Sequence, residues 1–201
     1  MAATSYSKYS FDDLLKLNIS IEKGHFMPQF DEILPSNLLS ETLQFNMQVP
    51  MDTEIAKMQL IVSPIMNELL RITNNGFTYF SGYQFDVEKE LGLKGHCDYL
   101  LTLKPKAVFI ESPVICVVEA KRDNIEDAIP QCIAEMYAAS IFNQKKGNDI
   151  KFTHGIITSG NDWQILRLEN NVVTINEAKF YLNILPQLLG ALKAVIDFYK
   201  A

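Results

Sequence analysis

The feature that most constrains the fold is an unbroken apolar run at residues 114–118, Val-Ile-Cys-Val-Val, which follows Pro113. Four of its five residues are β-branched, which favours an extended strand. A strand without polar positions has both faces buried, so it belongs at the centre of a sheet that helices cover on both sides. The run therefore predicts an α/β protein whose central strand ends at Glu119-Ala120-Lys121.

Helical and extended patterns alternate around this run. Apolar residues at spacings of three and four predict a long helix from about residue 52 to residue 72, kinked at Pro64 and ended by residues 74–76. Further helices are predicted from residues 123–124 onward and over 183–199, and strands over 83–87, 97–103, 155–158, 163–168 and 172–175. We expect a single domain over residues 1–201, an α/β/α sandwich with a central mixed sheet. Residues 1–50 are expected as a loosely organised cap and residues 51–201 as the core.

Charge and cysteine usage limit the classes of function. The 201 residues carry 18 Lys and Arg against 24 Asp and Glu, and residues 1–120 hold the whole acidic excess, 9 basic against 15 acidic side chains. This balance argues against a protein that coats nucleic acid through a basic stripe. No apolar stretch approaches the roughly 18 to 20 residues of a membrane span, and residues 1–6 lack the features of a secretory signal. Three cysteines without a CxxC pair predict free thiols in a reducing, cytoplasmic setting.

Asp98, Glu119 and Lys121 form the candidate chemical site. Glu119 and Lys121 lie two residues apart on one strand and project to the same side. If the strands that carry Asp98 and Glu119 pair as an antiparallel hairpin, two carboxylates meet beside an ammonium group. Two close carboxylates ionise together when a hard cation lies between them, and Mg²⁺ takes carboxylates together with water and phosphate. The pattern indicates metal-assisted phosphodiester hydrolysis, in which the lysine holds the attacking water and offsets negative charge.

These residues resemble the signature of the PD-(D/E)XK nuclease superfamily. The resemblance rests on Gly95-His96-Cys97-Asp98-Tyr99, on Glu119-Ala120-Lys121 after the apolar strand, and on Gln131 in the next helix. It extends through the hairpin motif at residues 158–163, Thr-Ser-Gly-Asn-Asp-Trp, and covers about residues 55–170. The pattern is similar in particular to the N-terminal nuclease domain of type I restriction enzyme motor subunits and to small stand-alone proteins like it. Cys97 stands where the name-giving proline would be, and many members lack that proline.

The resemblance implies a restriction-endonuclease-like fold and a nuclease that uses Mg²⁺ or Mn²⁺ to cleave nucleic acid, with DNA the expected substrate. It implies that Asp98 and Glu119 bind the metal together with the backbone carbonyl of Ala120. It further implies that Lys121 positions the water, that Glu68 completes or supports the metal site, and that Gln131 orients a ligand or contacts DNA.

Two further features leave alternatives open. A second tripeptide of the same kind, Glu177-Ala178-Lys179, also follows a short strand. We prefer the first because its strand is longer and more apolar and an intact helix follows it. Basic residues after the site are most simply a solvated helix end, but they could also contact phosphates; they are Arg122, Lys145, Lys146 and Lys151.

The sequence thus predicts a metal-dependent endodeoxyribonuclease that acts alone, as a homodimer, or with a separate motor or specificity partner. The alternative is a non-catalytic binding or scaffold domain that retains the nuclease fold. The acidic balance favours the alternative, because a free-standing nuclease must hold a polyanion. The presence of both Glu119 and Lys121 favours the nuclease.

Overall fold

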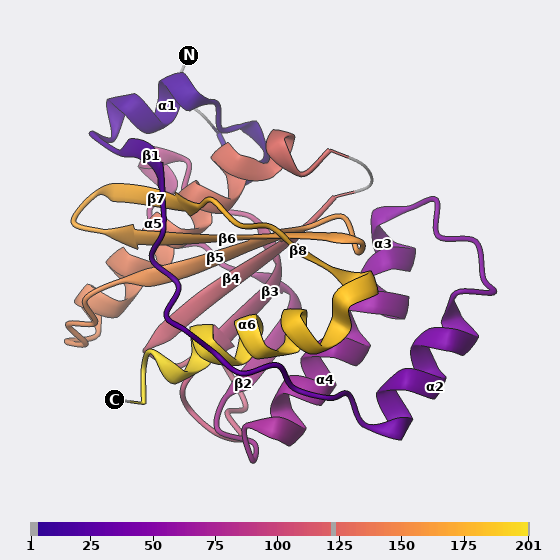
Figure 1. The fold of residues 1–201 in the computed structure, drawn as a ribbon. Coiled ribbons are helices and arrows are strands. Elements are labelled where there is room, and N and C mark those ends of the chain that lie inside the picture. Colours follow the sequence, from indigo (N-terminus) through magenta and orange to yellow (C-terminus); the bar gives the residue numbers. More distant parts are fainter. Residues whose placement is uncertain (1–3, 122–123, 201) are drawn as a thin grey trace.

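The computed structural model describes residues 4–121 and 124–200. A mixed sheet lies between two layers of helices (Figure 1), which confirms the predicted α/β sandwich. The strands are β1 (Ser20–Gly24), β2 (Thr78–Gln84), β3 (His96–Thr102), β4 (Val114–Ala120), β5 (Thr153–Thr158), β6 (Asp162–Glu169), β7 (Val172–Asn176) and β8 (Phe180–Tyr181). The α-helices are α1 (Phe11–Lys16), α2 (Asn37–Asn46), α3 (Glu54–Lys57), α4 (Ser63–Ile72), α5 (Ile129–Lys145) and α6 (Leu185–Asp197).

The strand order is β1-β7-β6-β5-β4-β3-β2, and β8 pairs with β6 outside this path. Strands β4 and β5 are parallel, as are β1 and β7, whereas the other pairs are antiparallel. The sheet is therefore mixed, as the sequence predicts. Every residue of β4 is buried, which confirms that the apolar run forms a central strand.

Two hydrophobic cores lie on opposite faces of the sheet. Helices α1 and α5 cover one face, while α2, α4 and α6 contribute to the core on the other (Figure 1). Helix α5 connects the parallel strands β4 and β5 and packs against both. A Cβ on Gly155 of β5 would lie 2.4 Å from the Met136 sulfur, so only glycine permits this close approach of helix and strand.

The long helix predicted from residue 52 to residue 72 consists of three parts. Thr53 caps α3 by accepting a hydrogen bond from the Ala56 N–H (3.1 Å). A π-helical turn, η2 (Met58–Val62), then precedes α4. Pro64 has no N–H to donate to the Leu60 carbonyl, and the Asn46 side-chain amide donates to it instead (2.7 Å).

The structure differs from the predicted pattern at the first strands. Strand β2 begins at Thr78, five residues before the predicted start, because Thr78 already pairs with Thr102 of β3. The regular strand ends at Gln84, and Phe85 and Val87 continue the pairing in irregular form. Phe85 donates its N–H to the Gly95 carbonyl (2.8 Å), and Val87 donates to Leu93 (3.0 Å). The alternation at residues 83–87 therefore reflects real pairing outside the regular strand.

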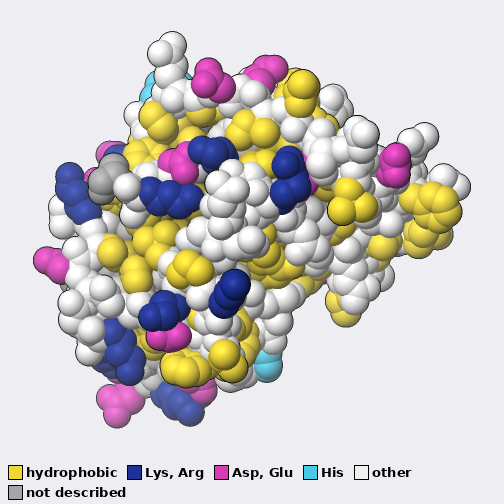
Figure 2. Space-filling model, turned by 90° about the horizontal axis from the view of Figure 1, so that it is seen from below, with side chains coloured by type: hydrophobic (Ala, Val, Ile, Leu, Met, Phe, Trp, Pro, Cys, Tyr) yellow, Lys and Arg dark blue, Asp and Glu magenta, His cyan; other side chains and the backbone are white. Residues whose placement is uncertain are grey.

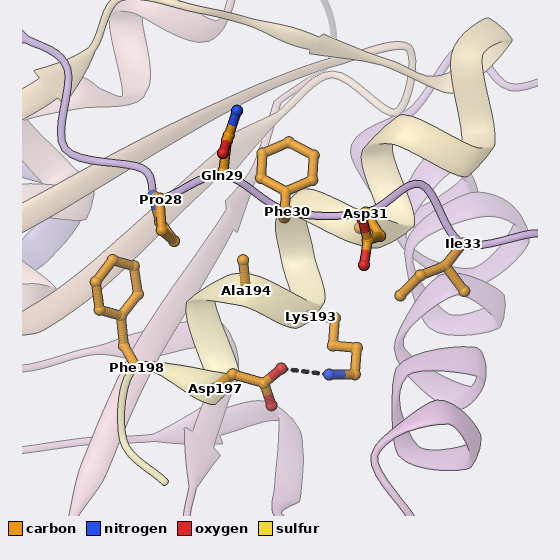
Figure 3. Close-up of a pocket in the computed structure, with 10 residues that line it drawn as sticks. Pro28, Gln29, Phe30, Asp31, Ile33, Lys193, Ala194, Asp197 and Phe198 are labelled. Atoms are coloured by element: carbon orange, nitrogen blue, oxygen red, sulfur yellow. Dashed lines mark hydrogen bonds and ion pairs between the residues drawn. The ribbon is translucent and has the colours of Figure 1, made fainter. Parts of the chain in front are cut away.

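The N-terminal region is more closely integrated than a loose cap. Strand β1 joins β7 as an edge strand of the sheet, with Ser20 opposite Val172. The segment between β1 and α2 then runs along α6, where the Ile33 N–H donates to the Pro186 carbonyl (3.0 Å). A hollow of about 570 Å³ lies between this segment and α6 (Figure 3). The N-terminal region thus contributes an edge strand to the sheet and also packs against helix α6.

Helix α2 leaves part of its apolar surface uncovered. Leu38 and Phe45, seven residues apart, are 75% and 74% exposed. Hydrophobic side chains are prominent on the lobe that projects at the right of Figure 2, the side on which α2 lies in Figure 1. None of the helices in the described ranges is long and apolar enough to cross a membrane.

Candidate active site at the end of strands β3 and β4

The antiparallel pairing of β3 and β4 brings Asp98 and Glu119 to neighbouring positions. Tyr99 lies opposite Val118 in the observed register, so the next step along the two strands sets Asp98 beside Glu119. The backbone N–H of Ala120 donates to Asp98 Oδ2 at 2.7 Å. This contact joins the two strands at the predicted site.

Lys121 follows directly on β4 and turns its ammonium group toward the same site. Its Nζ donates to Glu119 Oε1 at 2.7 Å and to Gln131 Oε1 at 3.3 Å. Its backbone N–H donates to the Thr158 carbonyl at 2.8 Å, which fixes the start of the connection against β5. The structure therefore brings together four residues named in the sequence analysis: Asp98 on β3, Glu119 on β4, Lys121 directly after β4, and Gln131 on α5.

Glu119 is a buried carboxyl group with an unused oxygen. The residue is 2% exposed, and its Oε2 has no hydrogen-bond partner among the described residues. Burial and the nearby Asp98 carboxylate raise the pKa of Glu119 to about 8, against the opposing effect of the Lys121 ammonium. Burial likewise raises the pKa of Asp98. A cation between the two groups would favour their ionised forms and give the free oxygen a partner.

The Lys121 ammonium is held in its charged form. Burial alone would lower the pKa of Lys121, but the carboxylates of Glu119, Glu54 and Asp98 outweigh burial and raise it. An ammonium group carries three donors, and two of them are directed at Glu119 and Gln131. Among the residues that the structure describes, these two are the side-chain acceptors of the ammonium, so its third N–H can reach a water molecule or a phosphate oxygen.

Glu54 is an upstream acid whose charge acts on the site, and no sequence motif singled it out. It lies in the first turn of α3, and its negative charge raises the pKa values of Asp98, Glu119 and Lys121. It also lines an open hollow of about 610 Å³ together with Asp52, Thr53, Ile55, Lys121, Asn124 and Asp127. Lys121 faces this hollow, and three of the seven lining residues are acidic.

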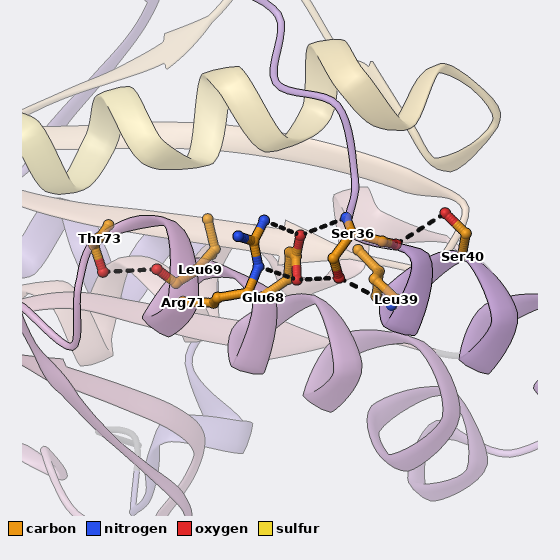
Figure 4. Close-up of polar contacts among 7 residues, drawn as sticks. All are labelled: Ser36, Leu39, Ser40, Glu68, Leu69, Arg71 and Thr73. Carbon is orange, nitrogen blue, oxygen red and sulfur yellow. Dashed lines mark hydrogen bonds and ion pairs between the residues drawn. The ribbon is translucent and has the colours of Figure 1, made fainter.

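Glu68, predicted to complete or support the metal site, is engaged elsewhere. Its two oxygens accept hydrogen bonds from the Ser36 N–H and hydroxyl (both 2.8 Å) and from the Arg71 guanidinium (Figure 4). The Arg71 guanidinium leads the causes that lower the pKa of Glu68. Glu68 follows Glu54 by 14 residues, about 21 Å along a helix. The structure thus corrects the predicted role: Glu68 anchors the start of α2 to α4.

The predicted basic contacts are not gathered at the site. Lys145 and Lys146 lie at the end of α5 opposite Gln131, about 21 Å away at 1.5 Å per residue. Lys145 forms an ion pair with Glu88, and Lys151 forms one with Glu169 (3.2 Å). Arg122 lies outside the described residues.

The second Glu-Ala-Lys tripeptide has different surroundings. Glu177 pairs with His25 at 2.9 Å, and both side chains are at least half exposed. The Glu177 side chain therefore lacks the buried setting that perturbs Glu119. This contrast favours the first tripeptide as the chemical one.

Gln131 and Glu135 extend the site into the core. Gln131 Nε2 donates to Glu135 Oε1 at 3.1 Å, while the second oxygen of Glu135 has no hydrogen-bond partner within residues 4–121 and 124–200. Burial, followed by the charge of Glu119, raises the pKa of Glu135 well above its usual range. The sequence pattern shows that the two residues share a helix face, but it gave no reason to assign Glu135 a role.

The residues present fit a divalent cation held by two carboxylates. Asp98 and Glu119 offer hard oxygen ligands. Glu119 Oε2, which no described residue hydrogen-bonds, can bind the cation. Within residues 4–121 and 124–200, no group of three or more His, Cys, Asp or Glu side chains is arranged as a metal site. A cation here would depend on water and substrate for its remaining ligands, as Mg²⁺ commonly does.

Comparisons with known proteins add no family assignment. No protein-family model matches the sequence, and no curated protein matches it.

Proposed function

We propose that this chain is a Mg²⁺-dependent nuclease that hydrolyses phosphodiester bonds, with DNA as its substrate. The observation that carries the proposal is the buried, unpartnered Glu119 oxygen, set beside Asp98 and next to the Lys121 ammonium. A core carboxyl without a partner costs stability. Its ion pair with Lys121, which lines an open hollow, favours a ligand-binding role.

The proposed roles follow from these contacts. Asp98 and Glu119 would hold Mg²⁺, with the Ala120 carbonyl as a backbone ligand, and Glu54 would add negative charge at the mouth. When bound, Mg²⁺ would polarise the phosphate and lower the pKa of a bound water. Lys121 would direct its remaining N–H at the attacking water or at a phosphate oxygen, where it offsets developing negative charge. Gln131 would keep the Lys121 ammonium beside Glu119.

The acidic mouth favours a second candidate function, a non-catalytic binding or scaffold domain. Asp52, Glu54 and Asp127 line the same hollow as Lys121, and this arrangement repels a polyanion when no cation is bound. Such a domain would keep the fold while the carboxyl pair remained unused.

A cleavage assay tests the proposal. Purified protein is incubated with supercoiled, linear, single-stranded and branched DNA in Mg²⁺ or Mn²⁺, beside Glu119→Gln and Lys121→Ala. Glu177→Gln serves as the matched control because it alters the second tripeptide. We expect cleavage by wild type and Glu177→Gln and a loss of at least about a hundredfold in the other two variants.

Thermal unfolding with added metal separates the two candidate functions. A bound cation raises the melting temperature by mass action, and Glu119→Gln should remove that rise. If metal leaves the melting temperature unchanged and no DNA is cut, the binding domain is the better description.

A further inference from the structure

Glu135 is an acid within a hydrophobic core. It lies on α5 and is fully buried, on the sheet-facing side that also carries Cys132 and Met136. The Glu135 carboxyl lies near the buried thiols of Cys97 and Cys132, whose pKa values burial raises. An apolar side chain would fill such a position at lower cost. We therefore infer that Glu135 has a role other than packing.

The side-chain amide of Gln131 connects Glu135 to the proposed site. Glu135 Oε1 accepts from Gln131 Nε2 at 3.1 Å, one helical turn away. Gln131 Oε1 in turn accepts from Lys121 Nζ at 3.3 Å. A glutamine amide has a donor end and an acceptor end. An acceptor at Glu135 holds the donor end, so the acceptor end faces Lys121.

We propose that Glu135 is a positioning residue for the hydrolysis proposed above: it fixes the Gln131 amide so that its oxygen holds the Lys121 ammonium beside Glu119. Because Glu119 and Gln131 accept from two of its donors, the orientation of the ammonium is fixed, and so is the direction of its third N–H. This inference rests on the proposed function, and it adds a residue that touches neither metal nor substrate.

The burial of Glu135 determines which substitutions imitate it. Burial raises the pKa of the Glu135 carboxyl, which favours the neutral acid. A neutral carboxyl still accepts a hydrogen bond through its carbonyl oxygen, and it places no further negative charge near Glu119. Glutamine keeps that acceptor and the shape of the side chain. Leucine and methionine fill the space without an acceptor.

The test compares Glu135→Gln, Glu135→Leu and Glu135→Met with wild type, and Met136→Leu serves as a core control on the same helix. The first readout is the ¹⁵Nζ–H NMR signal of Lys121 in lysine-labelled protein, assigned with Lys121→Arg. We expect the signal in wild type, Glu135→Gln and Met136→Leu, and its loss or shift in the leucine and methionine variants. Backbone amide spectra identify any variant that has not folded, and the methionine variant replaces the leucine variant if the latter fails.

The second readout is the rate of DNA cleavage in Mg²⁺. We expect kcat to fall about tenfold or more in Glu135→Leu at unchanged KM, as for a misplaced catalytic group, and to recover in Glu135→Gln. An unchanged Lys121 signal in the folded leucine and methionine variants overturns the proposal, as does its loss in Glu135→Gln. If no protein cleaves DNA, the proposed function fails, while the NMR comparison still decides whether Glu135 positions Lys121.

Discussion

Glu54 and Glu68 lie on one helical segment but have opposite surroundings, which gives a direct test at the residue scale. Glu68→Gln removes a buried charge that Ser36 and Arg71 bind, so we expect the unfolding free energy to fall by about 2 kcal/mol. The rise in melting temperature caused by Mg²⁺ should remain. Exposed Glu54 should show the reverse: Glu54→Gln changes stability by less than about 0.5 kcal/mol and reduces the Mg²⁺ effect. A Mg²⁺ effect lost only in Glu68→Gln would contradict this assignment.

His154 gives the protein a defined sensitivity to acid. The ring is fully buried, and its Nδ1 lies 2.6 Å from the Tyr199 hydroxyl. Burial, with a smaller effect of Arg167, lowers the pKa of His154 to about 3. An unfolded histidine titrates near 6.5, so between pH 6.5 and 3 the unfolded state binds the additional proton. The contribution of His154 to stability is therefore complete above pH 6.5 and is lost as pH falls toward 3.

We expect His154→Phe to remove this acid sensitivity. Urea unfolding of wild type and variant at pH 7, 6, 5 and 4 measures the difference in stability. Below pH 6.5, wild type should lose up to about 1.4 kcal/mol per pH unit relative to the variant. A difference that stays constant from pH 7 to pH 4 would show that the folded histidine takes up the proton as readily as the unfolded one.

Local sequence spacing predicts some of the site's neighbours but not the acid that approaches them from the upstream helix. The proximity of Asp98, Glu119 and Lys121 could be predicted from the ends of paired strands, whereas Gln131 was selected through the family resemblance alone. The choice between Glu54 and Glu68 depends on where η2 and α2 place the helix relative to β3. Those contacts join distant parts of the chain, so local spacing carries no information on them.

At the scale of elements, the junction of η2 and α4 depends on a side chain from another helix. Asn46 at the end of α2 donates to the Leu60 carbonyl, which Pro64 leaves without its helical partner. We expect Asn46→Ala to lower the unfolding free energy by about 1 to 2 kcal/mol, because a partly buried carbonyl loses its donor. In a Pro64→Ala background, the restored backbone N–H can take this place.

A double-mutant cycle by urea unfolding measures this exchange. The cost of Asn46→Ala should fall by at least about half when residue 64 is alanine. Equal costs in both backgrounds would mean that Asn46 acts independently of the missing N–H. The sequence predicts a kink at Pro64, but not the π-helical turn before it, because the compensating amide comes from α2, 18 residues earlier.

At the scale of the whole molecule, the N-terminal region joins parts that the central motif does not contain. Strand β1 pairs with β7 about 150 residues later, and the following segment crosses α6 on the other layer. The local sequence of this region shows only a pattern broken by prolines. It does not reveal the partners of the region, because they are distant in the sequence. The prediction of a sandwich depended on the core patterns alone, which is why the fold class was confirmed while β1 and α2 were not predicted.

Gly190 of α6 is the point at which this crossing is tightest, and it provides a last test. A Cβ at this position would lie 2.3 Å from the Asp31 carbonyl oxygen and 2.9 Å from the Phe30 ring. Gly190→Ala must therefore displace the crossing segment. We expect a net loss of about 1 to 2 kcal/mol in unfolding free energy, because overpacking exceeds the helix-propensity gain of about 1 kcal/mol.

Limited proteolysis shows whether the loss is local. Cleavage within residues 25–35 should become faster in Gly190→Ala, while Trp163 fluorescence, from a fully buried core residue, should stay native. Lys193→Ala is the matched control, since it lines the same hollow (Figure 3) without adding a group toward the segment. If metal binding also survives in Gly190→Ala, the crossing segment supports the fold independently of the site. A concerted loss of Trp163 packing would instead make the segment part of one cooperative unit with the core.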